Sequence, residues 1–459
     1  MLMINIDFMG FFCSMIGMCK VIINGDVMLF IMFMLCLFLF LGIHLSSHKL
    51  QRHIRFKKES IIRDHDKLII IWGRFMETHF VEEGLVKIQV PNFEKVSSEA
   101  PVFYNPVMEL NRDISVVVIN QYRKQLDHDI TICDAFGGTG IRGVRYSKEI
   151  DGVDSIAICD VNPLAIEQIK KNVELNDVDN VEVYKTDANI LLQSNKGLFD
   201  VVDIDPFGTP AMFLQATSAN IRPGGLICIS ATDTSALCGT YHDPCLRKYG
   251  AEPQKTEYCH ENGIRILIAA IARNLAVNQK YLNVLFSHST EHYMRIYATV
   301  SRGGKSTNKS LDNIGFISHC PNCLYRKTYH GYAPAMDKCC PECGHKFDIA
   351  GPLWLGHISN REFISKMIEM ADTLELNTKD KLLELFEKCL NESEGPITFY
   401  DIHKLCKKLK ISAPKMNEVI DEIRSRGYSI SRTHFKLTGM RTDMPLDELK
   451  SVIQDVKNG

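Results

Sequence analysis

Residues 129 to 233 alternate between short apolar runs and segments with apolar positions at helical spacing. DITICDAFGGTGIRGVRYSKEI and SIAICDVNPLAIEQIKKNVELN each contain one run followed by one such segment, and VEVYKTDANILL, LFDVVDIDPFG and GGLICISATD add three more runs. Each run has a polar residue near its end. Strands that alternate with helices predict an α/β fold, in which a mostly parallel, Rossmann-like sheet carries helices on both faces.

The last two apolar runs of this region, YLNVLFSHST and YMRIYATVSRG, are separated by only a few residues. A connection that short cannot carry a crossover helix, so we expect the sheet to end in an antiparallel hairpin. The polar stretch RGGKSTNKS follows, and its glycines and hydroxyl side chains predict a linker. We therefore expect one domain over residues 76–302 and a second over residues 303–459.

Amphipathic segments between residues 360 and 427 predict short helices, and YSISRTHFKLTG predicts a strand pair after them. Short helices followed by a wing suggest a winged-helix-like module. Ten lysines and arginines stand against three acids between His403 and Arg441. This stretch is therefore the expected nucleic-acid surface, with a solvated helix face as the alternative.

The N-terminal segment VMLFIMFMLCLFLFLGI, at residues 27–43, carries no charge. With its flanks, to about residue 45, it has roughly the length that spans a bilayer, and the basic residues after it would keep the rest of the chain on the cytoplasmic side. The alternative is that residues 1–75 are an upstream extension that is never translated, because globular patterning begins at Met76. A membrane is a partner only if the anchor is real.

The composition narrows the class of protein. The chain has 459 residues, of which 45% are hydrophobic and 24% charged, and its net charge is -2. These values describe a globular protein without a polyelectrolyte tail. Sixteen cysteines, scattered through apparent core strands except for one cluster near residue 320, indicate reduced thiols and a cytoplasmic location.

The glycine-rich turn GTGIRG contains Gly138 and Gly140 and lies between an expected strand and helix, as in dinucleotide-binding proteins. Asp160 follows Gly140 by 20 residues, where a carboxylate can accept hydrogen bonds from ribose hydroxyls. Enzymes that use nicotinamide and enzymes that use S-adenosylmethionine share this pattern. Asp134 favours the second, because it would repel a pyrophosphate but can accept from a methionine amino group. The alternative is that Asp134 and Asp160 only cap strand ends.

The stretch DVVDIDPFGTP places Asp205 where a buried strand should end. A carboxylate there is costly unless something uses it. Asp-Pro-Phe-Gly is similar to the motif with which amino-group methyltransferases hold an exocyclic amine, and a carboxylate that accepts N–H bonds makes the nitrogen lone pair available for attack on a sulfonium methyl. A strand-ending turn is the structural alternative.

CPNC at residues 320–323 and CPEC at residues 340–343 are separated by sixteen residues. Two Cys-x2-Cys turns at this spacing predict a closed, structural Zn²⁺ site of the zinc-ribbon kind. The expected ligands are Cys320, Cys323, Cys340 and Cys343. Cys339 is adjacent to Cys340 and could replace it.

Five separated motifs, VFYNPVMELNRDISV, DAFGGTGIRGVRY, DIDPFGTP, ATDTSALCGTY and SRTHFKLTGMRTD, resemble the archaeal tRNA (guanine-26) N2-dimethyltransferase family, from about Met76 to the C-terminus. The resemblance implies that Asp205 is the catalytic carboxylate and that Phe103 and Phe207 sandwich a flipped guanine. It also implies S-adenosylmethionine contacts for Arg112, Arg142, Asp160, Asp187 and Ala188.

The sequence thus predicts a class I methyltransferase that transfers one or two methyl groups from S-adenosylmethionine to the N2 of guanine 26 in tRNA, with no protein partner required. One alternative is another amino-group methyltransferase, acting on ribosomal-RNA guanine, DNA adenine or protein glutamine. The other is a non-enzymatic zinc-containing RNA-binding protein.

Overall fold

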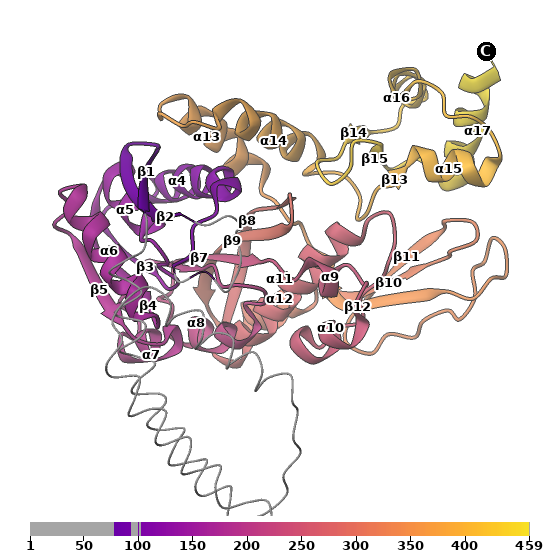
Figure 1. Ribbon diagram of the computed structural model, residues 1–459. Helices are drawn as coiled ribbons and strands as arrows, with labels where there is room; N and C mark the ends of the chain where they lie inside the picture. Colours follow the sequence, from indigo (N-terminus) through magenta and orange to yellow (C-terminus); the bar gives the residue numbers. More distant parts are fainter. Residues whose placement is uncertain (1–77, 93–99, 101, 459) are drawn as a thin grey trace, which may run out of the picture. The chain divides into compact units, whose positions relative to one another are not determined.

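The computed structural model describes residues 78–92, 100 and 102–458, and Figure 1 shows the arrangement of its helices and strands. The apolar segment at residues 27–45 and the rest of residues 1–75 lie outside the described part of the chain, so both interpretations of them stay predictions. Within the described residues, no helix is both long enough and apolar enough to cross a bilayer.

A seven-stranded mixed sheet is the centre of the fold, with the strand order β5-β4-β3-β6-β7-β9-β8. The first five strands in this order are parallel, whereas β9 is antiparallel to both β7 and β8. The parallel sheet and its terminal hairpin are therefore as predicted. Its strands are β3 (Ile130–Asp134), β4 (Val153–Asp160), β5 (Val181–Lys185), β6 (Val201–Ile204), β7 (Leu226–Ala231), β8 (Lys280–Thr290) and β9 (Tyr293–Arg302).

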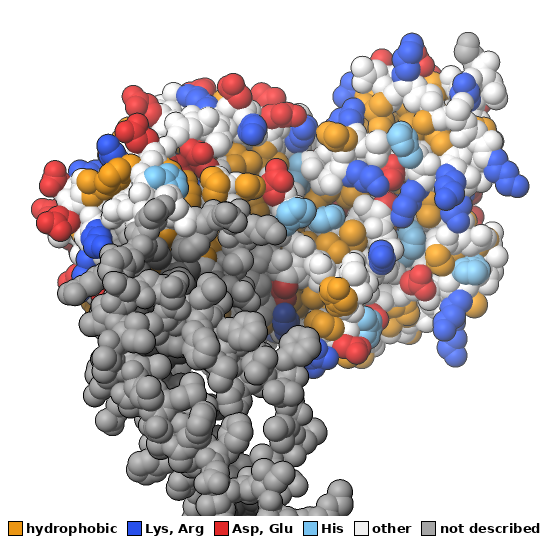
Figure 2. All heavy atoms as spheres, viewed as in Figure 1, with side chains coloured by type: hydrophobic (Ala, Val, Ile, Leu, Met, Phe, Trp, Pro, Cys, Tyr) orange, Lys and Arg blue, Asp and Glu red, His pale blue; other side chains and the backbone are white. Residues whose placement is uncertain are grey.

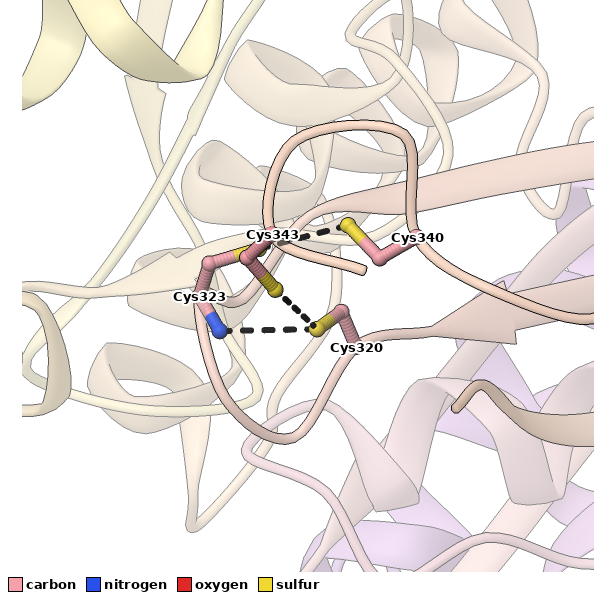
Figure 3. Close-up of side chains that lie close together, drawn as sticks. All are labelled: Cys320, Cys323, Cys340 and Cys343. Carbon is pink, nitrogen blue, oxygen red and sulfur yellow. Dashed lines mark hydrogen bonds between the residues drawn. The ribbon is translucent and has the colours of Figure 1, made fainter. Parts of the chain in front are cut away.

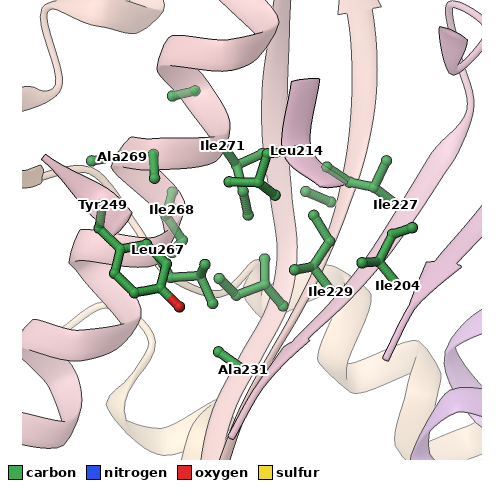
Figure 4. Packing of buried hydrophobic residues seen from close by; sticks show 14 of the residues in the cluster. Ile204, Leu214, Ile227, Ile229, Ala231, Tyr249, Leu267, Ile268, Ala269 and Ile271 are labelled. Atoms are coloured by element: carbon green, nitrogen blue, oxygen red, sulfur yellow. The ribbon is translucent and has the colours of Figure 1, made fainter. Parts of the chain in front are cut away.

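Helices cover both faces of this sheet because its strands are apolar on both sides, and two buried clusters result. One cluster joins β6 and β7 to α11 and neighbouring helices, and Figure 4 shows Ile204, Ile229 and Leu267 packed within it. The other joins β3 and β4 to the helices on the opposite face. The helices from this part of the chain are α4 (Glu109–Arg123), α5 (Ile141–Glu149), α6 (Pro163–Leu175), α7 (Ala188–Ser194), α8 (Leu214–Asn220), α9 (Thr234–Leu237), α10 (His242–Tyr249) and α11 (Cys259–Val277), with the short 3-10 helices η1 (Pro106–Met108) and η2 (Ala211–Phe213).

The stretch expected to be a linker forms a helix, so that prediction was wrong. Helix α12 (Gly304–Leu311) packs against α11 and β8, and its Thr307 is buried. Its polar residues face outward, which explains why the sequence reads as a linker. A β1–β2 hairpin (Thr78–Glu83 and Val86–Pro91) also precedes the sheet and packs on α5 and α6.

The chain beyond α12 adds two small sheets and several helices. The strands β10 and β12 share the α11 cluster, and α13 and α14 pack on α4, so segments before and after α12 contribute to the same cores. The division into domains at residue 303 stays a prediction. The elements are β10 (Ile314–His319), β11 (Arg326–His330), β12 (Asp348–Trp354), α13 (Arg361–Asp372), α14 (Lys379–Glu392), β13 (Tyr400–Asp401), α15 (Ile402–Leu409), α16 (Met416–Ser425), β14 (Ile430–Arg432), β15 (Gly439–Thr442) and α17 (Leu446–Asn458).

Packing of the α11 cluster predicts a specific stability effect. Ile229 in β7 is fully buried, so Ile229→Ala should lower the free energy of unfolding by about 2–5 kcal/mol through lost burial and a residual cavity. Denaturant unfolding measures the change. Val277→Ala is the matched control, because Val277 is 84% exposed at the end of α11 and its truncation should cost under about 0.5 kcal/mol. Equal losses in the two variants would contradict the cluster's role.

Candidate functional site at the carboxyl edge of the sheet

A cavity of about 940 Å³ lies at the carboxyl ends of the parallel strands. Strand order reverses beside β3, and this switch point is where open α/β sheets bind ligands. The cavity brings together residues from six separate parts of the sequence. Those that the sequence analysis named are Phe103, Arg112, Gly138, Arg142, Asp160, Asp205 and Phe207.

The glycine-rich turn joins β3 to α5 and forms one wall of this cavity. Gly138 and Gly140 have φ of +54° and +80°, a left-handed conformation that side chains disfavour. A Cβ at Gly138 would also lie 3.1 Å from the carbonyl oxygen of Phe103. Asp160, at the end of β4, accepts hydrogen bonds from the backbone N–H groups of Gly138 (3.0 Å) and Asn162 (2.8 Å). The turn is therefore held in one conformation, with Asp160 at the edge of the cavity.

Asp134 does not line the cavity, contrary to the contact expected for it. Its side chain is buried beneath the turn, where it accepts from the backbone N–H groups of Gly143 (3.1 Å) and Phe136 (3.4 Å). Burial, reinforced by the nearby Asp203, raises the pKa of Asp134 to about 7. We assign Asp134 to holding the turn, and a direct contact with a methionine amino group stays a prediction.

Asp205 follows β6 and lies in an ion pair with Arg142 of α5. Burial by itself would raise the pKa of Asp205, but Arg142 and Arg295 outweigh it and hold the pKa below its usual range. The carboxylate is 18% exposed and lines the cavity. Asp205 is therefore an ionised hydrogen-bond acceptor. Arg142, which was expected to contact S-adenosylmethionine, pairs with this carboxylate.

A second buried pair lies behind the first, and the sequence analysis missed it. Asp203, in β6, accepts two bonds from Arg295 of β9 (2.9 and 2.7 Å) and one from the Tyr146 hydroxyl (2.6 Å). The Arg142 guanidinium lies 3.6 Å from the same carboxylate. The only sign of this pair in the sequence is an aspartate within an expected buried strand. The sequence does not indicate which arginine pairs with it.

Phe103 and Phe207 are adjacent at the cavity, as the resemblance implies, but they do not form an open slot. Their ring centroids lie 4.3 Å apart and their planes meet at 83°, so the rings make an edge-to-face contact. Phe207 is 54% exposed. A base can lie between the two rings only after they separate.

Arg112 lines the cavity, but its guanidinium fork is engaged by Glu83 of β1, with distances of 2.5 and 2.7 Å. Glu83 also pairs with the fully buried Arg145, which contacts Glu149. The contact of Arg112 with S-adenosylmethionine that the resemblance implies therefore needs the pair with Glu83 to open, or the guanidinium to share one of its N–H groups. The hairpin that supplies Glu83 was not predicted.

Asp187 and Ala188 follow β5 but are not among the residues that line the cavity. The Asp187 side chain caps α7 by accepting from the Asn189 backbone N–H at 2.8 Å. Their expected contacts with S-adenosylmethionine stay predictions.

The four cysteines expected to bind Zn²⁺ lie together, as Figure 3 shows. The Cys320 and Cys343 Sγ atoms are 3.4 Å apart, and those of Cys323 and Cys340 are 3.5 Å apart. Cys339 is exposed and outside the group, whereas Cys340 lies with the other three cysteines.

The two cysteine turns have the same backbone design. Leu324 and Gly344, which follow the second cysteine of each turn, both have a φ of +69°. In each turn this residue donates its N–H to the carbonyl of the first cysteine, at 2.9 Å. Two matching turns that direct four thiols inward are a suitable geometry for a tetrahedral metal ion.

Most of the basic stretch from His403 to Arg441 is on the surface. Lys407, Lys408, Lys410 and Lys415 are exposed, and Lys and Arg side chains are scattered over the C-terminal part of the face drawn in Figure 2. Arg441 is different: it is buried and pairs with Glu261 of α11 (3.0 Å) and Glu392 of α14 (2.8 Å). It was counted with the nucleic-acid surface, and its burial excludes it from that role.

The sheet order, the antiparallel last strand and the glycine-rich turn beside an acidic strand end define a class I methyltransferase fold. A family model described as N2,N2-dimethylguanosine tRNA methyltransferase matches residues 84–454. The chain belongs to this family.

Individual relatives agree with the family match. A tRNA (guanine(26)-N(2))-dimethyltransferase from Methanosphaera stadtmanae is 76% identical over 382 residues, which are 83% of this chain and 98% of the relative. One from Methanobrevibacter smithii is 52% identical over 378 residues, 82% of this chain and 97% of the relative. The solved complex of Trm1 from Pyrococcus horikoshii with S-adenosyl-L-methionine has a TM-score of 0.74 and 32% identity, covering 82% of this chain and 99% of that one.

The ion pair between Arg142 and Asp205 predicts a pH effect. In the wild type, the lowered pKa of Asp205 keeps the carboxylate ionised through neutral and mildly acidic pH, so the methyl-transfer rate should be flat there. Arg142→Gln removes the cation while burial remains, which raises the pKa, so the rate should fall as pH decreases and recover as pH rises. Single-turnover rates at saturating donor measure this.

Arg222→Gln is the matched control, because Arg222 pairs with Asp200 away from the cavity, and its profile should stay flat. A flat profile for Arg142→Gln would show that Asp205 does not need the arginine to stay ionised.

Proposed function

We propose that this chain transfers a methyl group from S-adenosylmethionine to the exocyclic N2 of guanine 26 in tRNA. The observation that carries the proposal is the Asp205 carboxylate, held ionised by Arg142 in a cavity that also contains the glycine-rich turn and Phe207. The family and the names of its relatives supply the identity of the substrate.

The glycine-rich turn and Asp160 are suited to the donor. Glycines without side chains let a ligand approach the backbone at the start of α5, and Asp160 offers its remaining acceptor capacity to ribose hydroxyls. S-adenosylmethionine supplies an electrophilic methyl group on a sulfonium. Arg112, Asp187 and Ala188 are further proposed contacts from the family pattern.

Asp205 acts on the acceptor. The lone pair of an aryl amine is delocalised into the ring, and a carboxylate that accepts its N–H bonds makes the pair more available. Positive charge develops on the nitrogen as the bond to the methyl forms, and the fixed carboxylate stabilises that charge. A carboxylate with a low pKa is a weak base. A weak base is sufficient in this role, because the ammonium formed by methylation is itself acidic.

The target guanine must leave its stack to reach the cavity. Phe103 and Phe207 are placed to receive it between their rings once their edge-to-face contact opens. Because the first methylation leaves one N–H on N2, the same carboxylate can act in a second round. The chemistry thus permits either one or two transfers.

The C-terminal part is proposed to hold the tRNA. We propose that Cys320, Cys323, Cys340 and Cys343 bind a structural Zn²⁺, since thiolates at Zn–S distances of about 2.3 Å would lie roughly 3.8 Å apart, close to the spacing here. The helices α15, α16 and α17 with the β13-β15-β14 sheet are proposed as a winged-helix-like module whose lysines contact phosphates. A tRNA substrate fits the cytoplasmic location expected from the cysteines.

The first test is methylation of unmodified tRNA in vitro, with nucleoside mapping of the product. Asp205→Asn keeps the shape of the side chain but removes its charge, so it should lower the rate by about two to four orders of magnitude while calorimetry shows nearly unchanged donor binding. Near-normal turnover of Asp205→Asn would remove the carboxylate from the mechanism. Product mapped to another guanine would reject position 26.

The metal prediction can be tested on the same protein. Elemental analysis should find about one zinc ion per chain, and Cys320→Ser should lower that content and destabilise residues 315–350. Cys339→Ser is the matched control: it changes the exposed neighbour of Cys340 and should leave the zinc content unaltered. Wild-type protein free of zinc, and fully stable in a chelator, would contradict the site.

A further inference from the structure

Glu291 contributes a carboxylate to the cavity, and the proposed methyl-transfer chemistry gives it no role. It lines the cavity together with Asp205 and Phe207, although it comes from the hairpin between β8 and β9. Thr290 pairs with Tyr293, so Glu291 and His292 alone form the hairpin loop. The loop therefore carries Glu291 to the same cavity as the catalytic carboxylate.

The arginines and aspartates that line the cavity are already engaged. Arg112 pairs with Glu83, Arg142 pairs with Asp205, and Asp160 accepts from the backbone of the turn. In the described part of the chain, no hydrogen bond or ion pair engages the Glu291 carboxylate. Among the described residues, the Glu291 carboxylate thus remains available as an acceptor in the cavity.

The backbone at Glu291 is also unusual for its residue type. Its φ is +51°, and two-residue hairpin loops with a positive φ favour glycine, asparagine or aspartate. A long side chain in this conformation is strained, and such strain is concentrated at functional positions. Tyr293, which follows the loop, is 2% exposed and fixes the start of β9.

The substrate presents a matching group. The Watson–Crick edge of guanine has two neighbouring donors, the N1–H and the N2 amine, and a flipped base is read along that edge. Asp205 accepts from N2, where the methyl is added. Adenine has an acceptor in place of N1–H, so a carboxylate facing N1 would favour guanine and repel adenine.

We propose that Glu291 accepts a hydrogen bond from N1–H of the target guanine and so determines the specificity for that base. The inference rests on the proposed function, since it assigns a reader to the same base. The N1–H is not consumed by methylation at N2, so Glu291 can hold the base equally in a first and in a second transfer.

The experiment compares tRNA carrying guanine with tRNA carrying 2-aminopurine at the target position. 2-Aminopurine keeps the exocyclic amine but has an acceptor at N1. Wild-type protein should have a kcat/KM about 10- to 100-fold lower on 2-aminopurine, as for loss of a hydrogen bond to a charged group. Glu291→Ala should lower kcat/KM on guanine by a similar factor and leave the value on 2-aminopurine unchanged or higher, which removes the discrimination.

Glu291→Gln keeps an acceptor without the charge and should fall between wild type and Glu291→Ala. Glu174→Ala, at an exposed glutamate of α6 outside the cavity, should behave as wild type. Donor affinity and thermal unfolding check that the Glu291 variants are folded. Equal use of the two bases by wild type, or an equal loss on both bases in Glu291→Ala, would overturn the proposal. Failure of wild type to methylate the guanine-containing tRNA would instead overturn the proposed function.

Discussion

The buried arginines Arg142 and Arg295 are the constraint on which the site depends. They lie among Asp203 and Asp205, and each aspartate is placed at the end of the same strand. An unpaired buried charge costs several kcal/mol, so these four groups must be assembled together or not at all. Because the arginines come from α5 and β9, this requirement fixes both elements against β6. The Asp205 carboxylate is consequently set in position by the folding of the sheet itself.

Buried ion pairs between distant segments also occur away from the cavity. Glu83 of the first hairpin pairs with Arg112 and Arg145, and Glu261 of α11 pairs with Arg441 of the last sheet. Each pair is buried and joins segments that are far apart in the sequence. Breaking one partner would leave the other charge unpaired in the interior, so these contacts specify which segments meet.

Local patterns in the sequence predicted most of the sheet. Apolar runs followed by helical spacing gave the parallel strands, the short connection before Tyr293 gave the antiparallel hairpin, and two Cys-x2-Cys turns gave the cysteine cluster. Pairings between distant charges could not be predicted, because spacing along the chain does not indicate that Arg295 meets Asp203 or that Glu83 engages Arg112. Arg441 was misread for the same reason: a basic stretch does not reveal which of its residues is buried.

The contact between Phe103 and Phe207 has a consequence for what can enter the cavity. An edge-to-face aromatic pair contributes about 0.5–1.5 kcal/mol, and the two rings must give up that contact before the proposed guanine can lie between them. A macromolecule bound over a wide surface can offset this loss with contacts elsewhere, whereas a free nucleoside has only its own ring to offer. In the proposed function, where guanine is received between these rings, their contact therefore disfavours free nucleosides and nucleotides relative to tRNA.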